Sequence, residues 1–127
     1  MQDKDLFEYA VIRLVPKVER EEFLNVGVIL YCAKQKFLGL LYHLDKEKIS
    51  AVSTELDCKE AKEYLDAFEQ VCMGNAIASP IAKLPIAERF RWLTATRSTI
   101  IQTSKVHPGL CADAGDMLNK IYAQQVL

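Results

Sequence analysis

Residues 26–42 read VGVILYCAKQKFLGLLY and predict two antiparallel strands joined by a short turn. Val26 to Ala33 is apolar and rich in β-branched residues, as in an inner strand. Lys34-Gln35 forms the predicted turn, although the pair lacks the usual Gly or Asn, and Lys36 to Tyr42 returns as the next strand. Gly27 interrupts the first strand, which predicts a bulge or a close approach of another backbone.

Two further strands extend this hairpin on its N-terminal and C-terminal sides. Phe7 to Val15 reads FEYAVIRLV and has apolar residues on both parities, as in a central strand covered on both faces. Arg13 is its exception, and Pro16 ends it because proline cannot donate to a ladder. Thr96 to Val106 is the fourth predicted strand, and we expect Pro108-Gly109 to break it.

The helices follow from apolar residues spaced three or four apart. Cys58 to Met73 is the clearest, with Asp57 as its N-cap and Gly74-Asn75 as its stop. Pro85 opens a short helix through Leu93, and His43 to Ala51 is a short helix or turn. Asp113 caps a last helix, whose inner stripe comprises Met117, Leu118, Ile121 and Tyr122.

Strands that come mostly first and helices that come mostly later predict an α+β fold. We expect residues 1–127 to form a single two-layer domain. Its mainly antiparallel sheet of about four strands would pack against two or three helices. Half of the residues are apolar, which suffices for a sizeable core.

Bulk properties exclude several classes of protein. A net charge of −1 argues against a protein that coats nucleic acid, and no apolar run is long enough to cross a bilayer. The N-terminus lacks the apolar core of a secretory signal, so we expect a cytoplasmic protein. The four scattered cysteines are expected to be reduced and mostly buried; they are Cys32, Cys58, Cys72 and Cys111. The spacings of these cysteines with His43 and His107 match no metal-ligand pattern, so no metal site is expected. No cofactor is expected either.

Residues 88–109, ERFRWLTATRSTIIQTSKVHPG, are the region that we expect to carry function, because they combine three arginines, the only tryptophan, several hydroxyls and a histidine. Between Gln70 and Ala112 there are five basic residues and one acid, a local net charge of +4 that would attract an anion. We expect Arg89 or Arg91 to pair with Glu88 or with the acidic helix. We assign Trp92, with Phe90, to the core.

Arg97 differs, because Ser98 and Thr99 follow it and no acid lies within the next ten residues. A planar guanidinium and two hydroxyls can hold an oxyanion; the alternative is an arginine that bonds loop carbonyls. His107 is a candidate general acid or base, or else a brace for the turn. Ser98 and Ser104 are candidate nucleophiles by residue type alone.

Two segments, Tyr9–Cys32 and Glu88–Gly109, resemble the signatures of the bacterial domain of unknown function 3037. The family pattern falls on Arg13, Pro16, Glu19, Arg20, Glu22, Phe23, Asn25, Gly27 and Cys32, and then on Arg89, Phe90, Trp92, Arg97, Ser98, Thr99, Gln102, Ser104, His107 and Gly109. Thr96 departs from it, where proline is expected. Because both signatures mix charge with apolar strand residues, we expect a shared polar site comprising Arg13, Glu19, Glu22, Asn25, Arg97 and His107.

Three functions are compatible with these observations. The first is a non-enzymatic accessory or protein-interaction module, with a homodimer through a sheet edge or the Trp92 region, or with a kinase-like partner, which the family resemblance implies. The second is a binder of a phosphate-bearing ligand, a nucleotide or nucleic acid, through Arg97-Ser98-Thr99. The third is a small hydrolase or phosphoryl-transfer enzyme that uses Arg97 and His107, with Glu19 or Glu22 orienting the histidine. The candidate ligand-binding residues are Arg13, Asn25, Arg97, Ser98, Thr99, Gln102, Ser104 and His107.

Overall fold

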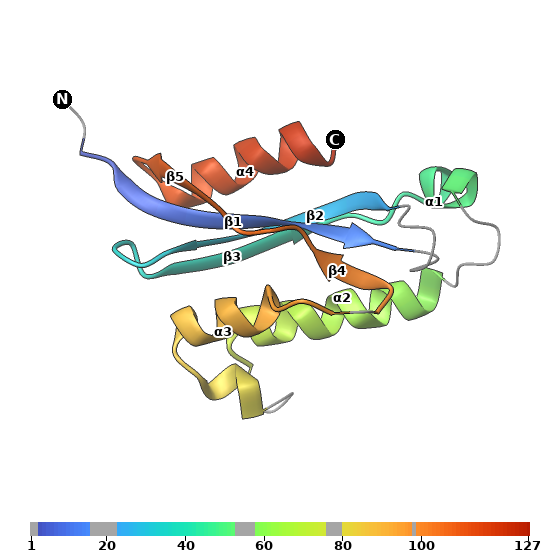
Figure 1. Cartoon of the computed structure of the whole chain (residues 1–127), viewed down its shortest axis with the longest axis horizontal. Coiled ribbons are helices and arrows are strands. Elements are labelled where there is room, and N and C mark those ends of the chain that lie inside the picture. The colour runs from blue at the N-terminus through green and yellow to red at the C-terminus, as the bar shows by residue number, and fades with distance from the viewer. Residues whose placement is uncertain (1–2, 16–22, 53–57, 76–79, 98) are drawn as a thin grey trace.

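The computed structural model describes residues 3–15, 23–52, 58–75, 80–97 and 99–127 (Figure 1). Its strands are β1 (Asp5–Leu14), β2 (Leu24–Cys32), β3 (Phe37–Tyr42), β4 (Ile101–Thr103) and β5 (His107–Cys111). Its helices are α1 (Lys46–Val52), α2 (Cys58–Met73), α3 (Ile86–Leu93) and α4 (Ala114–Gln125), with a 3₁₀ turn at Pro80–Lys83. The sequence predictions for Pro16, Glu19, Arg20, Glu22, Asp57 and Ser98 lie outside the described residues.

The sheet is antiparallel throughout its described strands, and β1 lies at its centre. On one side β1 pairs with β2, which in turn pairs with β3. On the other side β1 pairs with β5 along Asp5 to Tyr9 and with β4 along Ile12 to Leu14. The predicted hairpin of β2 and β3 is confirmed, and its turn is closed by a 3.1 Å hydrogen bond from the Lys36 amide to the Ala33 carbonyl.

The irregularity predicted at Gly27 is confirmed in both of its forms. Ile12 lies opposite Gly27, whereas Arg13 lies opposite Asn25, so β2 has one extra residue at this point, a bulge. A Cβ atom on Gly27 would lie 2.6 Å from the Leu41 carbonyl oxygen of β3. Only glycine permits this close approach.

The prediction that Pro108-Gly109 ends the last strand is wrong. Of the described residues in the predicted strand Thr96–Val106, only Ile101–Thr103 form a strand, β4. The chain pairs with β1 again from His107 to Cys111, so the sheet has five described strands rather than about four. Proline is tolerated here because β5 lies at the edge of the sheet. Gly109 is required by packing, since a Cβ atom there would lie 2.5 Å from the ring of Phe7.

The α+β class is confirmed, but helices cover both faces of the sheet, giving three layers rather than the expected two (Figure 1). One core lies between the sheet and α2 and α3, and includes Ile12, Leu65 and Phe90. A second core lies under α4 and includes Val28 and Leu118. The apolar residues on both parities of β1 serve these two cores.

The boundaries of α2, α3 and α4 agree with the sequence patterns, whereas α1 begins at Lys46 rather than at the predicted His43. The bounds of α2 are those predicted, and Gly74 ends it with a φ of +75°. The amides of Gly74 and Asn75 donate to the carbonyls of Val71 and Gln70, which satisfies the last turn. The side chain of Asp113 accepts from the Asp116 amide and caps α4 as predicted. None of the helices in the described ranges is long and apolar enough to cross a membrane.

Candidate functional site

The two sequence signatures meet at Arg13 on the central strand. Arg13 lies opposite Asn25 of β2 and opposite Gln102 of β4, so the three side chains form a row across the sheet, which we call the polar row. The polar row faces the α4 side, where the Asn25 amide nitrogen donates to the Gln125 carbonyl at 3.1 Å. The bulge at Gly27 brings Asn25 into this register.

The polar row contains two buried polar atoms that lack a hydrogen-bond partner. They are Nε of Arg13 and Oδ1 of Asn25, one donor and one acceptor. The guanidinium of Arg13 stacks on Phe23, with 4.2 Å from its carbon to the ring centroid. Gln102 donates to the Thr99 carbonyl at 2.9 Å and is therefore held by the loop before β4. Unmet groups of this kind are commonly bridged by an ordered water.

Ser104 joins the two halves of the sheet edge between β4 and β5. Its hydroxyl oxygen accepts from the Val11 amide at 2.9 Å, and its own amide donates to the Val11 carbonyl at 2.8 Å. The same hydroxyl donates to the Lys105 carbonyl at 2.9 Å, and the residue is buried. The side chain thus replaces a backbone acceptor where the strand is interrupted, and this geometry does not favour a nucleophile.

We expect Ser104→Ala to lower the free energy of unfolding by about 1–3 kcal/mol, because the Val11 amide would be buried without an acceptor. Urea unfolding at constant pH measures this change. Thr103→Ala is the matched control: the Thr103 hydroxyl only donates to the Thr94 carbonyl at 3.3 Å, so its loss should cost less. Equal stabilities of the wild type and Ser104→Ala would contradict this role.

His107 is exposed on β5 and does not meet Arg97. Its ring packs beside Tyr9, which lies opposite it in the ladder, with 5.3 Å between ring centroids. Tyr9 packs against the core under α4, whereas the guanidinium of Arg97 contacts Phe68 in the core on the other face. The structure therefore places the two residues proposed for catalysis on opposite faces of the sheet.

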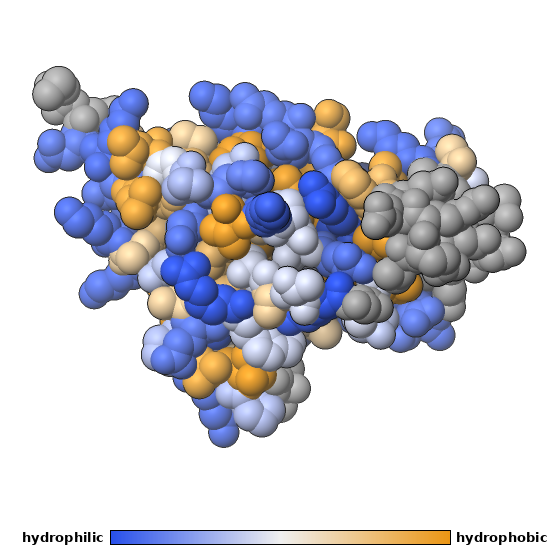
Figure 2. Space-filling view, viewed as in Figure 1, coloured by the Kyte–Doolittle hydropathy of each residue, from blue (hydrophilic) through white to orange (hydrophobic). Residues whose placement is uncertain are grey.

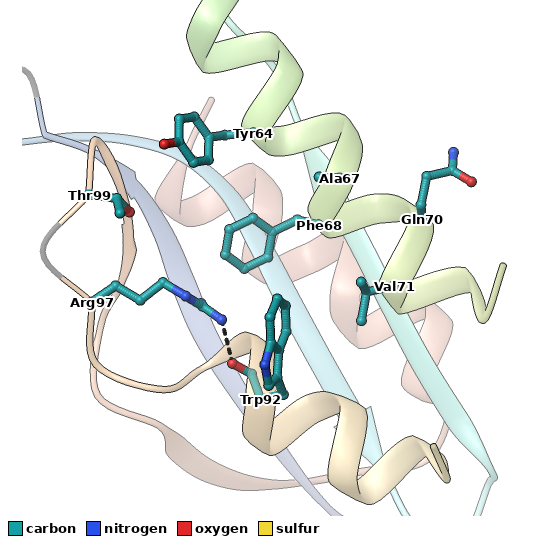
Figure 3. A pocket seen from close by; sticks show the side chains of 8 residues that line it. All are labelled: Tyr64, Ala67, Phe68, Gln70, Val71, Trp92, Arg97 and Thr99. Carbon is teal, nitrogen blue, oxygen red and sulfur yellow. Dashed lines mark hydrogen bonds between the residues drawn. The ribbon is translucent and has the colours of Figure 1, made fainter. Parts of the chain in front are cut away.

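Arg97 closes the C-terminal end of α3. Its Nη1 donates to the Leu93 carbonyl at 2.8 Å, and its Nη2 donates to the Trp92 carbonyl at 2.6 Å. Figure 3 shows the second of these bonds. The guanidinium carbon lies 4.9 Å from the ring centroid of Phe68 and 4.6 Å from that of Trp92. Burial lowers the pKa of Arg97, although an arginine remains protonated. The Thr99 hydroxyl donates to the Ile101 carbonyl. Of the two roles considered for Arg97, an oxyanion site and an arginine that bonds carbonyls, this geometry corresponds to the second.

The other two arginines of the second signature bind partners that are distant in sequence. Arg89 donates through Nη1 to the carbonyls of Val71 and Cys72, both at 3.4 Å, at the end of α2. Arg91 forms an ion pair with Glu8 of β1 at 3.2 Å. The expected pairing with Glu88 or with the acids of α2 is therefore wrong, because α3 directs these side chains toward β1 and toward the carbonyl end of α2.

A pocket of about 330 Å³ opens between α2, α3 and the loop at Arg97 (Figure 3). We call it the aromatic pocket, and its lining residues are Tyr64, Ala67, Phe68, Gln70, Val71, Trp92, Arg97 and Thr99. Tyr64 and Trp92 remain 39% and 42% exposed, whereas Phe90 is fully buried. The assignment of Phe90 to the core is confirmed, but that of Trp92 is wrong. Residues that are two apart on a helix, such as Phe90 and Trp92, point in directions that differ by about 200°, so the two rings cannot face the same side.

The sequence does not indicate the aromatic pocket as a site, because the apolar spacing predicts Tyr64, Phe68 and Val71 to be part of the inner stripe of α2. Tyr64, Phe68 and Val71 do lie on one face of α2, as the periodicity requires. However, α3 covers only part of this face and leaves Tyr64 at the rim. The signal available in the sequence is the presence of Trp92 and Arg97 within one short segment, residues 88–109, which contributes three of the eight lining residues.

The cysteines and the acidic side chains provide no metal centre in the part of the chain that the structure describes. Cys32, Cys72 and Cys111 are buried, Cys58 is half-buried, and all four are free thiols. Burial raises the pKa of the Cys72 thiol to about 12. A thiol with this pKa is protonated at neutral pH and is a poor nucleophile.

The fold and these contacts define a small α+β protein that has helices on both faces of its sheet and an arginine-containing aromatic pocket on one side. Residues 9–126 match the family model described as "Protein of unknown function (DUF3037)". The chain therefore belongs to this family, which confirms the resemblance of its two signatures. Comparison with curated proteins and with solved structures gives no match.

Proposed function

We propose that the chain is a non-enzymatic protein-interaction module that binds a large apolar side chain of a partner protein in the aromatic pocket. The observation that carries the proposal is the partial exposure of Trp92 and Tyr64 around an apolar cavity. Tryptophan, tyrosine and arginine are the residue types that contribute most to binding at protein interfaces. The aromatic pocket combines all three.

The size of the cavity supports an anchor of one or two side chains rather than a whole cofactor, since about 330 Å³ is at the lower limit of ligand pockets. On the face drawn in Figure 2, hydrophobic residues reach the surface in small separate groups among hydrophilic ones. The described residues on this face form no broad apolar area. A partner that inserts a side chain into a pocket needs no such interface.

The two alternative functions have less support from the geometry. Catalysis by Arg97 and His107 requires both to reach one substrate, but they lie on opposite faces of the sheet. An oxyanion held by Arg97-Ser98-Thr99 would need the Thr99 hydroxyl as a donor, but this hydroxyl already donates to the Ile101 carbonyl at 2.7 Å. An interaction module needs neither arrangement.

We test the docking with tagged wild type and Trp92→Ala, each used to capture partners from host lysate for quantitative mass spectrometry. We expect Trp92→Ala to reduce the amount of captured stoichiometric partner at least about tenfold. A tryptophan that a partner buries at an interface contributes more than about 1.4 kcal/mol to binding. A kinase-like protein is the partner that the family resemblance implies.

Leu110→Ala is the matched control, because Leu110 is 60% exposed on β5 and does not line the aromatic pocket. We expect it to capture the partner as the wild type does. Loss of the partner in Leu110→Ala but not in Trp92→Ala would move the interface to the sheet edge. A wild type that captures no stoichiometric partner would contradict the proposal.

A further inference from the structure

We propose that the aromatic pocket recognises the C-terminus of a partner peptide, with the last side chain in the cavity and the terminal carboxylate on Arg97. This inference rests on the proposed function and names the chemistry of its partner. It starts from the one charged side chain of the lining, which lies among Phe68, Trp92 and the end of α3.

The charge of Arg97 has no carboxylate partner among the described residues. Lys62–Asp66 and Arg91–Glu8 are ion pairs among the described residues, and neither involves Arg97. Its acceptors are the two carbonyls of α3, which provide only the partial negative charge of a helix C-terminus. A partly buried cation next to aromatic rings therefore lacks a full counter-charge, and a carboxylate from a ligand would supply it.

The guanidinium retains the donors that such a carboxylate needs. Arginine has five N–H groups, and the two bonds to the Trp92 and Leu93 carbonyls use one from each terminal nitrogen. The remaining N–H groups include one on each of these nitrogens. Hydrogen bonds between guanidinium and carboxylate are about twice as strong as those between neutral groups, and the planar fork suits the two oxygens of a carboxylate.

The short distance between charge and apolar lining favours a terminal carboxylate over an acidic side chain. Because the guanidinium lies within 5 Å of the ring centroids of Phe68 and Trp92, the anion must adjoin the apolar group that fills the cavity. In an extended peptide, neighbouring side chains point to opposite sides, and the next one on the same side is about 7 Å away. At a C-terminus, the carboxylate and the side chain share one Cα atom, so both reach the aromatic pocket together.

Trp92 provides a direct measurement, because it is the only tryptophan of the chain and lines the aromatic pocket. We would titrate the protein with acetyl-Gly-Ser-Gly-Phe as the free acid and as the C-terminal amide, and follow Trp92 fluorescence. The amide differs in lacking the terminal negative charge. We expect the acid to bind with a dissociation constant at least about tenfold lower than that of the amide, the effect of one charge-assisted interaction.

Variants of two arginines assign this preference to a residue. We expect Arg97→Gln to bind acid and amide alike, and Arg91→Gln to keep the preference, since Arg91 is paired with Glu8 and does not line the aromatic pocket. Circular dichroism checks that both variants fold. The comparison of acid with amide in the wild type stands even where a variant does not fold.

Each outcome decides between the two proposals. Equal affinity for acid and amide would overturn the recognition of a terminus while leaving the docking of an apolar side chain in place. No fluorescence response to either peptide at about 1 mM, the weak limit of specific binding, would also overturn it. The capture experiment with Trp92→Ala then decides the docking independently, because it uses the natural partner.

Discussion

Phe90→Ala is expected to lower the free energy of unfolding by about 3–5 kcal/mol, the usual cost of removing a buried phenylalanine. Phe90 is fully buried and packs beside Tyr31 of β2, with 5.3 Å between ring centroids, so it attaches α3 to the sheet. Small domains are stable by only about 5–15 kcal/mol. Its loss would therefore bring the protein close to unfolding, which a decreased urea midpoint would reveal.

Trp92→Ala is the matched control on the same helix. Trp92 is 42% exposed at the rim of the aromatic pocket, so its removal should cost much less stability while it removes partner binding. The two variants thus separate a residue of the core from a residue of the site. Equal destabilisation by both would contradict the assignment of Trp92 to the rim.

The sequence predicts those elements whose causes are local. The β2–β3 hairpin, the bounds of α2 and the Asp113 cap of α4 each depend on residues within one short segment. The bulge at Gly27 is also foreseeable, because a glycine in an apolar strand marks a close backbone approach. These features need only periodicity, capping and turn chemistry.

Features that depend on residues far away in the sequence are harder to predict from the sequence. The β5 strand forms despite Pro108 because β1 provides a ladder and the outer edge requires no donor from the proline. Ser104 reads as a candidate nucleophile until its bond to the Val11 amide is known. The apolar residues at both odd and even positions of β1 indicate helices on both faces of the sheet, whereas the order of strands and helices predicts only two layers.

The candidate site was foreseen in part for the same reason. The sequence predicts one polar site of Arg13, Glu19, Glu22, Asn25, Arg97 and His107. Of the described members, the ladder joins Arg13 to Asn25 and adds Gln102, whereas Arg97 and His107 lie elsewhere. The distribution of Arg97 and His107 between two faces depends on the break between β4 and β5, which no local pattern reveals. The sequence thus shows the chemistry of a side chain more directly than it shows which side chains lie beside it in the fold.

Arg97→Ala is expected to lower the free energy of unfolding by about 2–3 kcal/mol. The substitution removes two hydrogen bonds from a charged donor to the last carbonyls of α3, and the stacking on Phe68 and Trp92. Arg91→Ala is the control: its ion pair with Glu8 is partly exposed to solvent, and such pairs contribute at most about 1 kcal/mol. Urea unfolding of the three proteins measures both changes.

The same variant decides between a helix cap and an oxyanion site when unfolding is repeated with inorganic phosphate and with nucleotides. Phosphate lacks the apolar group that the aromatic pocket would bury. We therefore expect phosphate to leave unchanged the difference in the free energy of unfolding between wild type and Arg97→Ala. A ligand at a hundred times its dissociation constant would stabilise the wild type by about 2.7 kcal/mol. Stabilisation of this size that disappears in Arg97→Ala would make Arg97-Ser98-Thr99 a phosphate site. An unchanged difference in the free energy of unfolding would support Arg97 as a residue that binds the α3 carbonyls and a carboxylate in the aromatic pocket.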